Sequence, residues 1–341
     1  MAVASGTPDP ENLLARRLTG DLPVMVAFRS LLDRGGLRAL LRGALQAPAN
    51  DLALIVLRGA GVIESDAAGF WRLTPAMAAL WRADGPVIEA RLRFTLLAAS
   101  DLLHHGEALF SDKRAFVGKA ATYGFFRYAR AAGTGAAQIE DTEPWVRYVT
   151  ALNAAEAPVL APLIPVVNCV RLLEVGGNTG GFALALLALH PRLRAGVMDL
   201  PAVCHIGARD SAGHPDAGRL QFLPGDARAP DWPMLDTGRP DAILFKSVLH
   251  DWEGPPARDI LARAADHLAP GGRLIICERG PMADEPHISG LEAAANIVFA
   301  PFYRDPAVYE KIFRDLALSP LPRQSARLDM TFHVLTAVKP A

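Results

Sequence analysis

The sequence is poor in cysteine and has no long apolar run, and each of these absences excludes a class of protein. Its 341 residues include three cysteines and no Cys-x-x-Cys pair, so neither a zinc site nor a disulfide framework is indicated. No apolar run reaches the roughly 20 residues that cross a bilayer. Residues 1–10 lack the basic start and apolar core of a signal peptide. We therefore expect a cytoplasmic protein with no membrane partner.

The sequence also has no excess of charge of either sign. Its 35 Lys and Arg residues are matched by 36 Asp and Glu residues, which gives a formal net charge of −1. Nucleic-acid binders normally carry a basic excess or a basic stripe, so the composition argues against a nucleic-acid partner. A chain of this length more often forms two domains than one core.

Residues 11 to about 165 have mostly helical patterning. Apolar residues recur at helical spacing, and residues 51–59 read as a helix with an Asp cap and a Gly stop. Residues 61–74 then resemble two short strands around a glycine-containing turn. This order is typical of a winged helix. Arg58 and Arg72 alone are too few to contact phosphates, so we favour a protein–protein role for residues 1–165.

From Val170 onward the pattern changes to strands that alternate with helices. Such alternation predicts an α/β domain over residues 166–341, built as a Rossmann-like, doubly wound, mostly parallel sheet. The predicted strands are Val170–Val175, Ala195–Asp199, Leu220–Leu223, Ala242–Lys246, Arg273–Glu278 and Phe332–Val338. The predicted helices fall near Gly181–Leu189, Pro256–His267 and Ala307–Leu316.

A glycine-rich turn directly follows the first of these strands. The apolar run ends at Glu174, and Gly176 and Gly180 follow in the pattern E-x-G-x-x-x-G. A dinucleotide fingerprint needs G-x-G-x-x-G so that backbone can approach a pyrophosphate, and here Asn178 replaces its second glycine. An acid at position 174 suits a ligand without phosphate and with a cationic end, as in S-adenosylmethionine.

Three further polar segments follow the next strands. Asp199 lies nineteen residues after Gly180, where an acid is placed to accept ribose hydroxyls. Gly225-Asp226-Ala227 follows the third strand, and its Asp could accept the exocyclic amine of adenine. The fourth segment runs from Lys246 to Trp252 and contains Leu-His-Asp-Trp. In series at strand ends, these segments indicate one nucleoside site.

Together these motifs resemble the class I, S-adenosylmethionine-dependent small-molecule O-methyltransferases. The similar branch includes plant caffeate and flavonoid, bacterial antibiotic and carotenoid, and acetylserotonin methyltransferases. The resemblance covers nearly the whole chain, from the winged-helix-like half to the strand that ends at Glu278. It implies methyl transfer from S-adenosylmethionine to a hydroxyl of an aromatic or other secondary metabolite, with S-adenosylhomocysteine as product. It also implies a homodimer formed through the N-terminal domain, which would help to close the substrate pocket.

The resemblance also assigns roles to individual residues. His250 would be the general base, and Glu278 would orient it; we expect the adjacent Asp251 to point away from the ring. The acceptor would contact Trp145, Asp251 and Tyr303. The cofactor would be held by Glu174, Gly176, Gly180, Asp199, Leu200, Gly225, Asp226, Ala227 and Lys246.

One departure from the family pattern keeps other chemistries open. The family often has a second acid beside the base where this chain has Tyr303. A phenol could replace that acid as a hydrogen-bond partner, or the acceptor could need less help from a base. C- or N-methylation, or a cofactor-binding protein that no longer methylates, are therefore alternatives. A metal site at His250 and His287 and a winged-helix regulator are weaker ones.

Overall fold

The chain folds into two compact units. The structure, a computed structural model, describes residues 10–48, 50–252, 254–285 and 290–341. One unit comprises Met1–Tyr123 with Ser289–Val298, and the other comprises Gly124–Ile288 with Phe299–Ala341. Sequence analysis placed a boundary near residue 165, but residues 124–165 group with the second unit. The reason is that helix α8 (Ala136–Leu160) packs against helices α9 (Gly181–Leu189) and α10 (Pro201–Ser211).

The first unit has the expected winged-helix-like order. Asp51 caps helix α4 by accepting the N–H of Leu54 at 3.2 Å, and strands β1 and β2 pair as an antiparallel hairpin. Arg72 on this hairpin pairs with Glu64 at 2.9 Å. The elements are α1 (Pro10–Gly20), α2 (Leu22–Asp33), α3 (Gly36–Leu41), α4 (Leu52–Gly59), β1 (Ile63–Ser65), β2 (Trp71–Leu73), α5 (Pro75–Ser111) and α6 (Lys113–Lys119). Two short helices, α7 (Ala121–Phe125) and α12 (Ala294–Phe299), lie where the chain passes between units.

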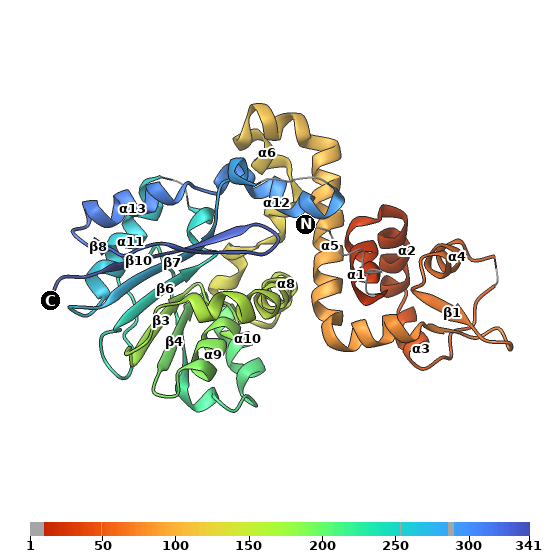
Figure 1. The fold of residues 1–341 in the computed structure, drawn as a ribbon, viewed down its shortest axis with the longest axis horizontal. Coiled ribbons are helices and arrows are strands. Elements are labelled where there is room, and N and C mark those ends of the chain that lie inside the picture. The colour runs from red at the N-terminus through yellow and green to blue at the C-terminus, as the bar shows by residue number, and fades with distance from the viewer. Residues whose placement is uncertain (1–9, 49, 253, 286–289) are drawn as a thin grey trace, which may run out of the picture. The chain divides into compact units, whose positions relative to one another are not determined.

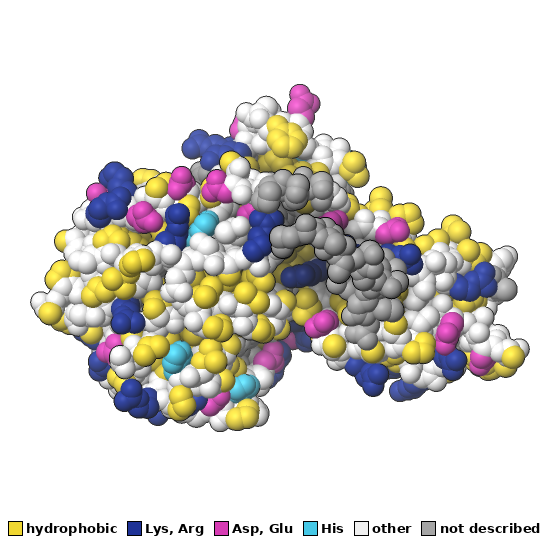
Figure 2. Space-filling model, viewed as in Figure 1, with side chains coloured by type: hydrophobic (Ala, Val, Ile, Leu, Met, Phe, Trp, Pro, Cys, Tyr) yellow, Lys and Arg dark blue, Asp and Glu magenta, His cyan; other side chains and the backbone are white. Residues whose placement is uncertain are grey.

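Charged side chains of both signs are interspersed over the face drawn in Figure 2. Basic and acidic groups alternate there with apolar and polar surface, which agrees with a formal net charge near zero. No helix of the described residues is long and apolar enough to cross a membrane.

The second unit is built on one sheet of eight strands. Strands β3 to β7 run parallel, and β10 joins them antiparallel to β7, in the order β5-β4-β3-β6-β7-β10-β8 with β9 also paired to β10. The strands are β3 (Arg171–Val175), β4 (Arg194–Asp199), β5 (Leu220–Pro224), β6 (Ala242–Lys246), β7 (Arg273–Arg279), β8 (Ser319–Pro320), β9 (Gln324–Arg327) and β10 (Thr331–Val338).

Helices cover both faces of this sheet (Figure 1). Alternate residues of each strand enter different cores, because successive side chains in a strand point to opposite faces. Leu172 and Leu244 pack with α8 and α9 in one core, whereas Leu173 and Phe245 pack with α11 (Pro255–His267) and α13 (Pro306–Asp315) in the other. The central strands are therefore apolar throughout, as expected for a doubly wound sheet.

The strand order reverses at β3, which lies between β4 and β6. Ligands of such sheets bind at this reversal, beyond the carboxyl ends of the strands. The loops after β3 and β6 approach each other closely there. A Cβ on Gly176, whose φ is 70°, would lie 2.6 Å from the Cγ2 of Val248. The sequence therefore needs glycine at position 176 both for its backbone conformation and for the close approach of these loops.

The six predicted strands and three predicted helices of this unit are confirmed, and no end differs by more than one residue. The sequence pattern did not predict β8 and β9. Both are short edge strands whose residues are mostly exposed, so they lack the apolar alternation that marks a half-buried strand.

The sheet core predicts a contrast between two leucines. Leu244 is fully buried in β6, whereas Leu189 at the end of α9 is 49% exposed. We expect Leu244→Ala to lower the free energy of unfolding by about 2–5 kcal/mol, because it leaves a cavity between β6 and α9. Leu189→Ala, the same chemical change at the surface, should lower it by less than about 1 kcal/mol. Urea unfolding followed by circular dichroism measures both, and equal losses would contradict this account of the core.

Candidate active site

Glu174 ends β3 as a buried carboxyl group without a full set of partners. Glu174 is 1% exposed, and among the described residues its Oε2 atom has no hydrogen-bond partner. Burial raises the pKa of Glu174 to about 8, although the nearby Lys246 ammonium opposes this shift. A carboxyl group of this kind is held largely protonated at neutral pH and would gain from a cationic ligand.

Asp199 ties the end of β4 to the glycine-rich turn. Its two carboxylate oxygens accept the N–H groups of Asn178 at 2.8 Å and Leu200 at 2.7 Å. Asn178 has a φ of 53°, a left-handed conformation that Asn tolerates better than most residues. Burial raises the pKa of Asp199 to about 6 against these two hydrogen bonds. Asp199 thus fixes the turn and still presents an acid beside it.

The segment after β5 lies at the same edge of the sheet, beyond the carboxyl ends of the strands. Gly225 donates its N–H to the carbonyl of Asp199 at 2.9 Å, and the carbonyl of Ala227 accepts from Trp232 at 3.2 Å. Asp226 pairs with Arg228 at 2.6 Å, and this guanidinium lowers the pKa of the carboxyl group. The Asp226 carboxylate is thus ionised but already paired.

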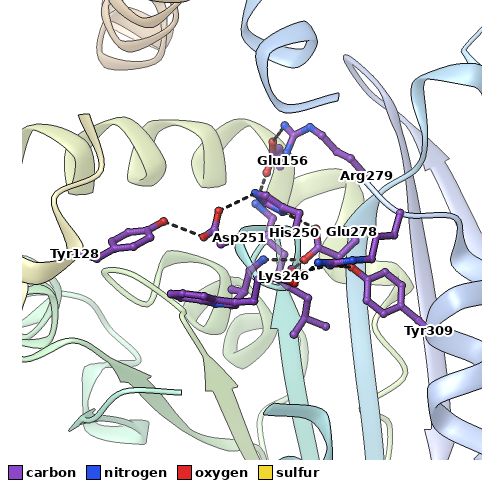
Figure 3. A network of polar contacts seen from close by, with 12 residues as sticks. Tyr128, Glu156, Lys246, His250, Asp251, Glu278, Arg279 and Tyr309 are labelled. Atoms are coloured by element: carbon purple, nitrogen blue, oxygen red, sulfur yellow. Dashed lines mark hydrogen bonds and ion pairs between the residues drawn. The ribbon is translucent and has the colours of Figure 1, made fainter. Parts of the chain in front are cut away.

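Glu278 organises the loop that follows β6 (Figure 3). Its Oε1 accepts the N–H groups of Val248 at 2.8 Å and Leu249 at 2.7 Å, and its Oε2 lies 2.8 Å from the Nδ1 of His250. The loop begins at Ser247, which has a φ of 54°. A left-handed serine is strained, and such residues cluster at functional sites. One buried carboxylate therefore fixes both the backbone of the loop and the ring of its histidine.

Asp251 lies on the other side of the same ring. Its Oδ1 is 3.5 Å from the Nε2 of His250, and its Oδ2 accepts the hydroxyl of Tyr128 at 2.9 Å. The expectation that Asp251 points away from His250 is therefore wrong, because Tyr128 holds this carboxylate beside the ring. Burial lowers the pKa of His250, but the carboxylates of Glu278 and Asp251 outweigh it and leave the pKa above its usual value.

Aromatic side chains surround His250 and come from separate elements of the second unit. The rings of Tyr303 and Phe299 lie 5.6 Å and 6.2 Å from the His250 ring, centre to centre. Trp145 packs on Tyr128 at 5.4 Å, and among the described residues its indole N–H has no partner. Tyr303 is thus brought to the base as predicted. Trp145 lies one ring further away, because it packs on Tyr128 and also on Phe126, which contacts Phe299.

Lys246, predicted to hold the cofactor, is part of a buried charge cluster. Its Nζ donates to Asn153 at 2.6 Å and to one oxygen of Glu156, whose other oxygen pairs with Arg279 at 2.7 Å. Lys246 acts on Glu174 through the charge of its ammonium group, which lowers the pKa of that carboxyl group. Sequence analysis missed Glu156 and Arg279, since a charged residue in a helix or at a strand end carries no signal of burial.

The described residues contain no group of three His, Cys, Asp or Glu side chains that could hold a metal ion. His287, the second histidine considered for a metal, lies outside the described residues. The sequence assigned fourteen residues to cofactor binding, to the base and its partner, or to acceptor contacts, and all of them belong to the second unit. Gly180 is the residue that caps α9 at its start. Trp145 was expected in the N-terminal domain and lies in the second unit instead.

Comparison with known proteins shows the family to which this chain belongs. The O-methyltransferase domain family matches residues 120–313. The chain is 34% identical over 119 residues to 3-hydroxy-5-methyl-1-naphthoate 3-O-methyltransferase of Streptomyces sahachiroi, which covers 35% of this chain and 33% of the relative. It is 30% identical over 239 residues to demethylspheroidene O-methyltransferase of Rhodobacter capsulatus, which covers 69% of this chain and 54% of the relative.

The chain thus spans about a third to a half of the length of these curated relatives. A solved structure of human N-acetylserotonin methyltransferase in complex with SAM matches with a TM-score of 0.68. That likeness covers 99% of this chain and all of the other at 16% identity, so it shows the fold alone. Since the family match covers more than half of the chain and contains the glycine turn, His250 and Glu278, the protein belongs to the O-methyltransferase domain family.

Proposed function

We propose that the protein transfers a methyl group from S-adenosylmethionine to a hydroxyl group of an aromatic acceptor. The observation that carries this proposal is the setting of His250. Its Nδ1 faces the buried carboxylate of Glu278 at 2.8 Å, and its ring lies 5.6 Å from the half-buried ring of Tyr303, centre to centre. A histidine whose one nitrogen is fixed by a carboxylate is suited to act as a general base with the other.

The residues at the strand ends fit the cofactor. The unpartnered oxygen of Glu174 suits the cationic amino-acid end, and Asp199 beside the turn suits the ribose hydroxyls. Gly176 and Gly180 have φ values of 70° and 74° and leave room for a close approach of backbone to ligand. We further assign Leu200, Gly225, Asp226 and Ala227 to the nucleoside; Asp226 would share its carboxylate with Arg228. When bound, S-adenosylmethionine supplies a methyl group already activated by its cationic sulfur.

His250 would remove the acceptor proton. With the Nδ1 proton donated to Glu278, the Nε2 lone pair is available to an acceptor hydroxyl, and the Glu278 carboxylate stabilises the imidazolium that forms. Asp251, whose carboxylate accepts the hydroxyl of Tyr128, lies near the Nε2 of His250 and would face the acceptor there. In this chain Asp251, rather than a residue at position 303, supplies the second acid beside the base.

The aromatic side chains around the base favour a flat acceptor. Phe299 and Tyr303 contact the His250 ring, and Phe126 lies 6.1 Å from Phe299. Half-buried aromatic rings that converge on one catalytic group are typical of pockets for planar ligands. C- or N-methylation on the same fold remains the alternative, because Tyr303 departs from the family pattern. Locating the methyl group on the product decides between them.

We also propose that the first unit forms a homodimer. Leu103 and Phe110 are both 82% exposed on helix α5, and a spacing of seven residues places them on one side of the helix. Large exposed apolar side chains on one helix face often mark a protein–protein contact.

The raised pKa of Glu174 predicts that cofactor binding releases a proton. Because the free carboxyl group titrates at about 8, the ammonium group of S-adenosylhomocysteine binds only after that proton leaves. Affinity should therefore rise up to about tenfold per pH unit between about pH 6.5 and about pH 8, then level off. Calorimetric titration in buffers of different ionisation enthalpy measures the proton release. Glu174→Gln should abolish it, and a parent whose affinity does not change with pH would contradict the assignment.

Replacing the base should separate chemistry from binding. We expect His250→Ala to lower kcat by about 10²–10⁴-fold, since the acceptor proton has no other acceptor as well placed. Affinity for S-adenosylhomocysteine should stay close to that of the parent. The assay follows S-adenosylhomocysteine release with a panel of hydroxylated aromatic compounds. His205→Ala, an exposed change on α10, is the matched control. Turnover that persists in His250→Ala would reject His250 as the base.

The Glu278 contact should set the pKa of His250. In the parent we expect this pKa above its usual value, and in Glu278→Gln we expect it to fall, because the negative charge that favours the imidazolium is gone. The rate of methyl transfer rises with pH as His250 loses its proton, so this limb should move to lower pH in Glu278→Gln while kcat falls. Proton NMR titration of the ring and a pH–rate profile measure the two effects. Glu140→Gln, the same change at an exposed position of α8, is the control. An unchanged His250 pKa in Glu278→Gln would refute the role of Glu278.

A further inference from the structure

Arg304 holds the backbone of the loop that carries His250. Its Nη1 donates to the carbonyl oxygen of Leu249 at 2.6 Å, and its Nη2 donates to that of Trp252. These two carbonyl groups flank His250 and Asp251, at either end of one turn of 3-10 helix. A guanidinium group presents its donors as a rigid, planar fork, so it bridges two acceptors that an ammonium group would reach only one at a time. Arg304 thus fixes the backbone on both sides of His250.

Arg304 is itself anchored in the core of the second unit. Its Nη1 also donates to the hydroxyl of Tyr309 at 2.9 Å, and its guanidinium lies 5.8 Å from the centre of that ring. Tyr309 is 1% exposed and belongs to α13. This helix begins directly after Asp305, which caps it by accepting the N–H of Ala307 at 2.8 Å. The donors of Arg304 therefore start from a fixed position.

The loop needs such contacts because its backbone is strained where it begins. Ser247 has a φ of 54°, in the left-handed region. Strain of this kind costs about 1–3 kcal/mol and persists only where the surrounding contacts over-determine the backbone. Glu278 holds the loop by two of its N–H groups, those of Val248 and Leu249. Arg304 holds the same loop by two of its carbonyl groups, so the two side chains secure complementary parts of one backbone.

Arg304 also ties this loop to an aromatic ring beside His250. Tyr303 directly precedes Arg304 in the chain, and its ring lies 5.6 Å from the ring of His250, centre to centre. Burial raises the pKa of Asp251, and the Arg304 guanidinium is among the groups whose charge opposes that rise. The hydrogen bonds of Arg304 therefore help to set where the Tyr303 ring, His250 and Asp251 lie relative to one another.

We propose that Arg304 is a positioning residue for methyl transfer, which keeps His250 and Asp251 in a fixed position beside the ring of Tyr303. It acts through the carbonyl groups of Leu249 and Trp252 and not through a contact with the acceptor. This inference rests on the proposed function for the role of His250, and it adds what holds that residue in place. A misplacement of about 1 Å can slow a reaction about a hundredfold. Loss of Arg304 should therefore affect turnover more than cofactor binding.

Arg304→Ala with chemical rescue tests the proposal. With the panel of hydroxylated aromatic compounds, we expect kcat to fall by about tenfold to a hundredfold, while Kd for S-adenosylhomocysteine stays within about twofold of the parent. Guanidinium ion at millimolar concentrations, too low to unfold the protein, should restore part of the lost kcat because it can bridge the same two carbonyl groups. Methylammonium carries the same charge without the fork and should not. Arg314→Ala removes an exposed arginine from α13 and should leave kcat unchanged.

Amide hydrogen exchange tests the position of the loop without any acceptor. The N–H groups of Asp251 and Trp252 donate to the carbonyl groups of Val248 and Leu249, both at 3.1 Å. We expect both amides to exchange at least about tenfold faster in Arg304→Ala, because local opening of the loop becomes easier. The amides of β6 should keep the rates of the parent.

Arg304→Lys covers the case in which the alanine variant does not fold. Its ammonium group reaches one carbonyl at a time, so kcat should fall by less than in Arg304→Ala and guanidinium should not restore it. The proposal is overturned by either variant if it keeps the kcat of the parent, by loop amides whose exchange rates do not change, or by a loss of kcat matched by an equal loss of affinity for S-adenosylhomocysteine. A parent that turns over no acceptor would reject the proposed function, whereas faster loop exchange in Arg304→Ala would still show that Arg304 holds His250 in place.

Discussion

The structure of the active site depends on the carboxylate of Glu278. It is 3% exposed and accepts hydrogen bonds from two backbone N–H groups of the loop after β6, while its other oxygen faces the Nδ1 of His250. Burial raises the pKa of Glu278, but His250 and these N–H groups outweigh it, so the pKa stays below its usual value and the group ionised. Hydrogen bonds to a buried charged group are worth about 1.5–3 kcal/mol each. A single residue thus stabilises the loop and orients the ring of His250.

The geometry of the sheet explains why Glu278 can do this. It lies on β7, next to β6, so its side chain reaches the loop that continues from β6. The same strand sends the next side chain, Arg279, toward Glu156 on α8. Adjacent strand residues point to opposite faces. One strand end therefore supplies both the partner of His250 and a buried cation that joins β7 to α8.

Two groups of buried charged side chains differ in how their charges are balanced. Glu174 and Asp199 have raised pKa values because burial favours their neutral forms, and a cationic, hydroxyl-bearing ligand would restore their charge. Lys246 and Arg279 differ, because they pair with the carboxylates of Glu156 and Asp329. Against the effect of burial, these carboxylates hold the pKa of Arg279 well above its usual value, so this second group of charges is balanced within the protein.

Much of the second unit could be predicted from the sequence. The strands from β3 to β7 are apolar runs that end in Glu, Asp, Lys or Gly-Asp segments, and parallel topology places those ends on one edge. The positions of Gly176, Asp199 and His250 at that edge follow from this rule. The edge strands β8 and β9 could not be predicted, because their exposed polar residues have no periodic pattern. The first unit was predictable as far as its hairpin, since helix caps and glycine turns are local signals.

The sequence by itself determined the fold class, the positions of most strands along the chain and the segments that meet at the site, because apolar periodicity and turn residues act over a few neighbouring positions. The order of the strands in the sheet came from the structure. Only the tertiary structure decided that Asp251 faces His250, that Tyr128 holds it there, and that Glu156 on α8 joins Lys246 to Arg279. These contacts link residues between one and 123 positions apart in the chain. Their energies depend on burial and on distances that no local pattern records. The chemistry of a strand end can therefore be read from the chain, but the partners that tune it are set by packing.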